Sequence, residues 1–382
     1  MGYGIYDGLV QLLLDNVSNL LAYILGYQIE FQDSLKSTLI DAFEMTTILL
    51  FLIINTILLI WLERKVASGR AWTARGPVFI DFNYGHFFGK TWKFGLLQNI
   101  AEFLKFFSKE DIVPEKADKF PFNIGFFAFV VAPPFILGAI LPLGATLVIA
   151  SPAVGFLLIF ALFSLYPIGV LVTGWSSNNK YSLLGGLRSA AQMISYEIPL
   201  MLSITSVVLV THSFSLIEIA QQQISLPFAI LMPIGFIVFM AALTAETERI
   251  PFDIPEAEAE LVMGWRTELT GFRYMMSMAT EYFILLIGAF IGVFLFWGGA
   301  YLPFGILRGE IEAIPLLAFI ILVVKLWIFI FLYVWVRASL PRVRIDQLLD
   351  IGWKRLVPLA ILNIIYVIFI VLYFPQLFGV VQ

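Results

Sequence analysis

Seven acidic side chains lie within 23 residues of this sequence, between positions 246 and 268. They are Glu246, Glu248, Asp253, Glu256, Glu258, Glu260 and Glu268. Clustered carboxylates raise one another's pKa, and burial raises it further. Both effects bring glutamate toward neutral pH, where it can take up and release protons. The spacing therefore indicates a proton-transfer site, and an acidic surface that docks a partner subunit is the alternative.

Two prolines shape the expected structure of this segment. Pro251 and Pro255 interrupt helix, so the first part should be an irregular hairpin. A short helix is expected from Pro255 onward, with its acidic residues near the positive N-terminal end. On that helix Glu256 and Glu260 share one face.

Other charged residues lie inside long apolar runs or at their ends. A charge inside a bilayer is expensive, so each of these residues is a functional candidate. Glu197, Glu281 and Lys325 lie inside runs, and Lys325 needs a carboxylate partner or a wet cavity. Glu63 and Arg337 lie at the ends of runs, where a solvated helix end is the alternative.

The elements that must position these residues are membrane helices. Apolar residues make up 60% of the chain and charged residues only 13%, with a mean hydropathy of +0.93. A soluble domain carries about a quarter charged residues. Lipid offers the backbone no hydrogen-bond partners, so runs of about 20 apolar residues form spanning helices. Eight runs qualify, near 39–62, 122–147, 151–174, 189–211, 226–246, 274–298, 314–336 and 356–375.

The predicted fold is therefore all-α, a polytopic membrane protein with about eight transmembrane helices in a domain at 39–375. Residues 1–38 form an extension that contains an interfacial or extra helix, and 376–382 form a C-terminal tail. Of the 23 Lys and Arg residues, 20 lie on one side, in or beside the loops 63–121, 175–188, 247–273 and 337–355. The positive-inside rule makes that side cytoplasmic and puts both termini on the outer face of the cell inner (plasma) membrane.

Two further stretches are informative. The polar residues from 175 to 185 either cap helix ends or line a polar cavity. The aromatic and basic stretch at 86–120 suits a helix in the headgroup layer. The sequence has no cysteine and only two histidines, so thiolate metal sites and iron–sulfur ligation by this chain are excluded. We expect no metal and no redox centre in this chain.

Several of these segments resemble the NuoH family, a membrane component of the NADH-quinone oxidoreductase called complex I (NADH dehydrogenase subunit 1 in mitochondria). The similar segments are Glu63-Arg64-Lys65, 174–197, 246–265, 280–283 and 337–354. The loop at 66–95 departs from the family pattern. The resemblance implies an eight-helix subunit beneath a peripheral arm, which forms much of the chamber where quinone enters and supplies acidic residues toward the ion-translocating subunits.

The resemblance also implies roles for individual residues. The residues expected to couple proton movement are Glu197, Glu246, Asp253, Glu256, Glu258, Glu260 and Glu281. The residues expected at the quinone chamber are Arg64, Glu63, Glu102, Arg249, Glu268 and Trp265. Structural or coupling roles are expected for Lys325, Arg337 and Asp346.

The function that the resemblance implies is that of a subunit of a proton-translocating oxidoreductase that reduces quinone with NADH, a reduced deazaflavin or ferredoxin. Quinone is then the substrate, and flavin and iron–sulfur clusters lie in partner subunits. The expected partners are a peripheral-arm iron–sulfur subunit, quinone-site subunits, small membrane subunits and antiporter-like subunits, with no nucleic acid. The alternatives are a subunit of a membrane-bound hydrogenase or ferredoxin-driven ion pump, a secondary transporter built on Lys325, Glu281 and Glu197, and a membrane anchor.

Overall fold

A computed structural model of the chain describes residues 33–68, 86–87, 90–91, 96–142, 155–224, 226–253, 262–306 and 308–373. The predicted helix before residue 30 and most of the loop at 66–95 lie outside these residues. So do Glu256, Glu258 and Glu260, together with the short helix expected from Pro255.

Helices make up nearly all the regular structure of the described residues, which confirms the all-α prediction. An antiparallel pair of two-residue strands, β1 (His86–Phe87) and β2 (Lys90–Thr91), is the exception within this part of the chain. The helices are α2 (Asp33–Ser68), α3 (Leu96–Ser108), α4 (Lys119–Ile124), the π-helical η1 (Gly125–Val131), α5 (Ala132–Ile140), α6 (Gly155–Phe163), α7 (Leu165–Ser176), α8 (Lys180–Thr211), α9 (Leu216–Gln222), α10 (Phe228–Leu231), α11 (Pro233–Glu246), the 3-10 helix η2 (Gly264–Arg266), α13 (Gly271–Phe296), the 3-10 helix η3 (Pro303–Gly305), α14 (Arg308–Ala313), α15 (Pro315–Ser339), α16 (Ile345–Asp350), the π-helical η4 (Ile351–Leu356) and α17 (Val357–Tyr373).

Among the described residues, seven helical segments are long and apolar enough to cross a membrane. The chain is therefore a polytopic membrane protein, as predicted. The predicted fifth span, 226–246, differs from the seven because it is divided into α10, with four residues, and α11, with 14. Met232 separates the two helices with a non-helical backbone, φ -128° and ψ 62°, and Pro233 starts the second. Proline disfavours helical geometry in the residue before it, which explains the break.

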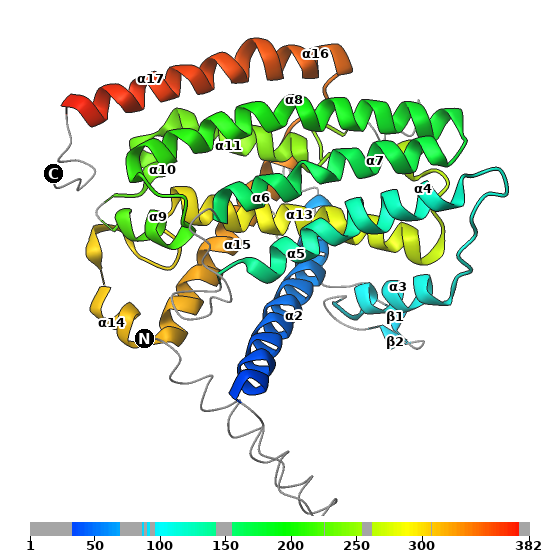
Figure 1. Ribbon diagram of the computed structural model, residues 1–382, viewed down its shortest axis with the longest axis horizontal. Coiled ribbons are helices and arrows are strands. Elements are labelled where there is room, and N and C mark those ends of the chain that lie inside the picture. Colours follow the sequence, from blue (N-terminus) through cyan, green and yellow to red (C-terminus); the bar gives the residue numbers. More distant parts are fainter. Residues whose placement is uncertain are drawn as a thin grey trace, which may run out of the picture.

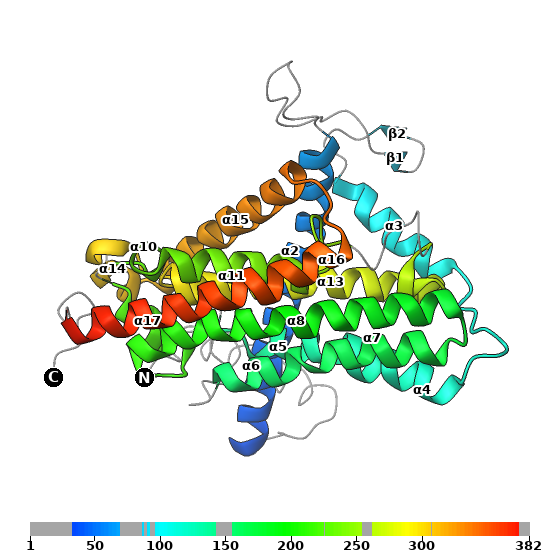
Figure 2. The ribbon, with the colours of Figure 1, turned by 90° about the horizontal axis from the view of Figure 1, so that it is seen from above.

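The helix α13 occupies the centre of the bundle. Every residue from Thr280 to Phe296 is buried, and α13 contacts α2, α5, α9, α11 and α15. Figures 1 and 2 show α7, α8, α11, α13 and α17 running along the long axis, while α2 and α15 cross them obliquely. The amphipathic α3 lies at the edge, beside α2 and α13. A charge on α13 is therefore far from bulk water and needs partners from neighbouring elements.

The loop predicted at 175–188 is largely helix, because α8 already begins at Lys180. Asn179 caps this helix: its backbone is extended, and its side-chain oxygen accepts a hydrogen bond of 3.0 Å from the Tyr181 N–H. Gly185 then lets α8 approach η2 closely, since a Cβ at this position would lie 2.5 Å from the backbone of Gly264. The cap at Asn179 and the close packing at Gly185 explain why α8 extends into a polar sequence.

Candidate functional site

Six charged residues of alternating sign, five of them buried and Arg337 partly exposed, form a continuous line across the helix bundle, and we call this line the charge chain. Its members come from α15, α2, the loop after α11, α13 and η2. In spatial order they are Arg337, Glu63, Arg249, Glu281, Arg266 and Glu248.

Arg249 holds the middle of the charge chain. Its Nη2 lies 3.1 Å from Glu281 Oε2, and its Nη1 lies 4.0 Å from Glu63 Oε1. Glu63 Oε1 also pairs directly with Arg337. The Arg249 guanidinium stacks 4.1 Å from the centre of the Tyr282 ring, which adds a cation–π contact. One guanidinium thus joins the carboxylates of two membrane helices, α2 and α13.

Arg266 continues the charge chain on the other side of Glu281. It pairs directly with Glu281, and its Nη2 lies 3.6 Å from Glu248 Oε2. Its guanidinium carbon lies 4.8 Å from the centre of the Trp265 ring. The Arg266 side chain is fully buried and that of Glu248 is 1% exposed. A buried charge is tolerated only when it is paired, so the alternation of signs is a condition of this packing.

The turn after α11 brings Glu248 and Arg249 into position. Glu248 has a φ of +49°, in the left-handed region that reverses the chain direction. The Gln192 side-chain amide on α8 donates to the carbonyl oxygens of Ala245 at 2.8 Å and Phe252 at 2.9 Å, on either side of the turn. Because both flanks of the turn are fixed to α8, Glu248 and Arg249 are held in defined positions.

Glu246 ends α11 just before this turn. It is buried, and its Oε2 has no hydrogen-bond partner among the residues that the structure describes. Glu197, half-buried on α8, and Glu248 are the charged groups that act on it. Three acidic residues, Glu197 on α8, Glu246 at the end of α11 and Glu248 in the loop, thus lie near one end of the charge chain.

Arg64 and Glu102 form a second, more exposed pair. Two hydrogen bonds of 2.9 and 2.5 Å connect the Arg64 guanidinium to the Glu102 carboxylate. Their side chains are 50% and 35% exposed. Since Arg64 lies on α2 and Glu102 on α3, the pair fixes the amphipathic helix against the bundle.

Three further predicted acidic residues also lie outside the charge chain. Asp253 pairs with Arg342 at 2.6 Å, and Asp346 forms an exposed pair with Arg344 at 3.1 Å. Glu268 accepts a hydrogen bond of 2.5 Å from the Asn179 side-chain amide. The predicted acidic loop is thus divided between several places.

The sequence predicts a carboxylate partner or a wet cavity for Lys325, and the structure instead pairs it with backbone carbonyl groups. Its Nζ donates to the carbonyl oxygens of Trp297 at 2.6 Å and Tyr301 at 2.5 Å, where α13 ends. The last carbonyls of a helix have no partner within it, so an ammonium group satisfies them. Trp297 lies about 24 Å along the helix axis from Glu281, at 1.5 Å per residue. The structure therefore does not bring together the transporter site built on Lys325, Glu281 and Glu197.

Arg266 is a site residue that the sequence did not single out. It was expected only as one of the basic loop residues, and Glu248 only as a member of the acidic cluster without a role. Both are buried and belong to the charge chain. The available signal was that Arg266 and Arg249 are the two arginines within the stretch of seven carboxylates at 246–268, since a buried acidic cluster needs counter-charges.

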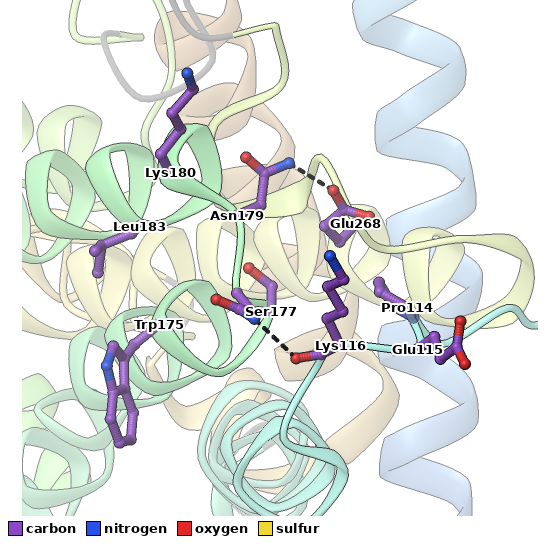
Figure 3. A pocket seen from close by; sticks show the side chains of 10 residues that line it. Pro114, Glu115, Lys116, Trp175, Ser177, Asn179, Lys180, Leu183 and Glu268 are labelled. Carbon is purple, nitrogen blue, oxygen red and sulfur yellow. Dashed lines mark hydrogen bonds between the residues drawn. The ribbon is translucent and has the colours of Figure 1, made fainter.

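A cavity of about 790 Å³ lies apart from the charge chain, where α7 ends and α8 begins. Figure 3 shows its lining, which includes Trp175, Asn179, Lys180 and Glu268. The sequence left open whether the polar stretch at 175–185 caps a helix end or lines a polar cavity, and it does both. Asn179 caps α8 with its side-chain oxygen, and its side-chain nitrogen faces the cavity wall at Glu268.

Comparison with known proteins gives the family. A family model described as NADH dehydrogenase matches residues 43–368, well over half of the chain. The matched range contains the charge chain, the pair Arg64–Glu102 and the cavity. The match confirms the resemblance to NuoH and makes the chain a membrane-embedded member of a multisubunit oxidoreductase complex. The chain belongs to the NADH dehydrogenase family, that of the NuoH subunit of complex I.

Proposed function

We propose that this subunit forms the chamber through which quinone enters the complex, and that its buried charges couple quinone reduction to proton translocation. The observation that carries this proposal is the charge chain, which joins α15, α2 and α13 through the loop after α11. The polypeptide has no cysteine to bind an iron–sulfur cluster. We therefore propose that the electrons come from an iron–sulfur centre in a partner subunit.

The charge chain suits coupling because neighbouring pairs share their members. Glu281 interacts with both Arg249 and Arg266, and Arg249 interacts with both Glu281 and Glu63. If Glu281 takes up a proton, both guanidinium groups lose a counter-charge in a buried environment. An unpaired buried charge is costly, so the ion pairs on both sides of Glu281 must rearrange. A local change of charge thereby reaches α2 and α15.

Glu246 and Glu197 extend this path toward α8. We propose that protons taken up during quinone reduction change the charge near the 246–268 loop, and that these two acidic residues respond with the charge chain. The Oε2 atom of Glu246 supports a role in proton exchange, because this oxygen has no fixed donor among the described residues. Glu256, Glu258 and Glu260 keep the coupling roles that the family resemblance implies.

We propose that quinone enters at the junction of α2 and α3. Here the pair Arg64–Glu102 lies beside an apolar surface of α3. On that surface Phe103, Leu104 and Phe107 are 44%, 57% and 54% exposed. Such a surface suits the headgroup layer of a membrane. A long apolar quinone tail can pass along it while the polar head meets the charged pair.

We further propose that the basic loops face the cytoplasm and that the membrane is the cell inner (plasma) membrane. The donor is NADH, a reduced deazaflavin or ferredoxin, and the soluble subunits that copurify with the complex will identify it. A flavin-containing NADH module, a deazaflavin module or neither are the three distinguishable results.

The test replaces Glu281 by Gln in the intact complex, which keeps the shape and removes the charge. Quinone reduction and the proton gradient are then measured in liposomes. We expect an assembled complex in which coupled quinone reduction is strongly reduced. The matched control is Asp350→Asn, which removes an exposed carboxylate paired with Lys354 at 2.8 Å and should leave activity unchanged. Full coupled activity in Glu281→Gln would disprove the coupling role.

A further inference from the structure

The cavity between α7 and α8 lies at the ends of two helices that are long and apolar enough to cross a membrane. The membrane-crossing segment of α7 ends at Ser176, and that of α8 begins at Lys180. This position suits the level of the lipid headgroups. Trp175, on its wall, is 60% exposed. Tryptophan is enriched at this level because its ring is both apolar and polar.

Charges of both signs line this cavity. Lys116 and Lys180 contribute two positive groups, and Glu115 and Glu268 contribute two negative groups. Figure 3 shows the Lys116 ammonium directed toward the Glu268 carboxylate from the opposite wall. A cavity lined in this way suits a ligand that is itself zwitterionic, because a purely anionic ligand would meet the carboxylates.

The walls of the cavity are fixed by hydrogen bonds. The Asn178 side chain donates to the Lys116 carbonyl oxygen at 3.0 Å, and the Asn179 side chain holds Glu268 at 2.5 Å. The Ile112 N–H donates to Thr270 Oγ1 at 2.8 Å, which attaches the loop before α4 to the start of α13. A site that is already formed loses little entropy when it binds a ligand.

We propose that this cavity binds the headgroup of phosphatidylethanolamine from the surrounding membrane. The lipid phosphate pairs with Lys116, and its ammonium group donates to Glu268, so the headgroup bridges the two walls. Lys180 and Glu115 also line the cavity, farther from this pair. The acyl chains follow the outer surface of α8, where Leu184 and Leu187 are 49% and 48% exposed. This site shares no residue with the charge chain.

The headgroup chemistry predicts an order among lipids. Phosphatidylcholine has the same phosphate, but its quaternary ammonium group cannot donate a hydrogen bond to Glu268. Phosphatidylglycerol has no cation. A hydrogen bond to a charged group contributes enough free energy for a preference of about tenfold. Phosphatidylethanolamine should therefore bind about tenfold better than either of the others.

The experiment uses the intact complex in liposomes that contain a trace of photoactivatable lipid. Three probes carry the same diazirine on the acyl chain and differ only in headgroup: ethanolamine, choline or glycerol. Labelled peptides are identified by mass spectrometry. We expect the ethanolamine probe to label the peptides around Trp175 and Leu184 about tenfold more than the other two.

Two variants make the test specific. Lys116→Gln and Glu268→Gln each remove one half of the proposed headgroup site and should lower labelling of these peptides by about tenfold. The control is Lys119→Gln, an exposed lysine outside the cavity lining, which should leave labelling unchanged. Equal labelling by all three probes, or labelling that Lys116→Gln does not change, would overturn the proposal. So would a zero-length crosslink from Lys116 to a partner subunit, because a protein segment would then fill the cavity.

Discussion

Glu281 Oε2 lies 3.1 Å from Arg249 Nη2, and this contact joins the centre of α13 to the loop that follows α11. Both side chains are almost completely buried, at 3% and 6% exposed. Every other contact of the charge chain extends from this pair toward α2 and α15 or toward η2. The geometry therefore makes Arg249 the residue on which the integrity of the site depends most.

Arg249→Met should destabilise the complex as well as inactivate it. Removing one member of a buried ion pair costs about 3–5 kcal/mol, because the partner is left charged and buried. Here the abandoned partner is Glu281, with Glu63 also affected. Thermal denaturation of the purified complex measures the loss. Arg344→Met is the control, since that side chain is 78% exposed, and its melting temperature should equal that of the wild type.

Arg249→Lys tests geometry rather than charge. A guanidinium has a planar fork that reaches two carboxylates and stacks on Tyr282, whereas an ammonium group is a single point of charge. We expect intermediate stability and a clear loss of quinone reduction. A lysine variant that keeps full activity would show that the double contact is dispensable.

The pair Arg64–Glu102 should respond to charge reversal in a different way. Both side chains are partly exposed, so the interaction contributes about 0.2–1 kcal/mol. Arg64→Glu and Glu102→Arg should each raise the KM for quinone up to about fivefold while leaving assembly intact. The double variant restores the pair in reverse and should recover most of the affinity. Two single effects that simply add in the double variant would argue against a direct interaction.

Gly185→Ala should disturb the position of η2. A Cβ at this position would lie 2.5 Å from the Gly264 backbone, and η2 carries Trp265 and Arg266. Overpacking of this kind costs about 1–3 kcal/mol. We expect less assembled complex in the membrane fraction, measured by native electrophoresis. Gly309→Ala is the matched control, because a Cβ there meets nothing within 4 Å, and its assembly should be normal.

Lys325→Met should separate a structural role from a coupling role. The substitution leaves the carbonyls of Trp297 and Tyr301 without their donor, and an unsatisfied buried acceptor costs about 1–3 kcal/mol. We expect a lower melting temperature, with an unchanged ratio of protons translocated to quinone reduced. A changed ratio would assign Lys325 to coupling.

The apolar runs by themselves determined the class of this protein. A helix is the only open-ended structure that satisfies its backbone groups in lipid, so runs near 274–298 and 314–336 predict α13 and α15 closely. The same reasoning singled out Glu281, Glu63 and Arg337, because charges within or beside such runs are costly. The limits of α8 and the break at Met232 depended on a cap and a proline, which a window of hydropathy does not register.

Only the tertiary structure decided which charges meet. Arg337 and Glu63 are far apart in the sequence, and their pairing depends on how α15 crosses α2. Arg266 joins the charge chain because η2 packs against α8, whereas Glu268, two residues later, faces a separate cavity. Hydropathy is a local property of the chain, so it can be read from neighbouring residues. Charge pairing depends on contacts between distant helices, so it is settled only when the bundle is packed.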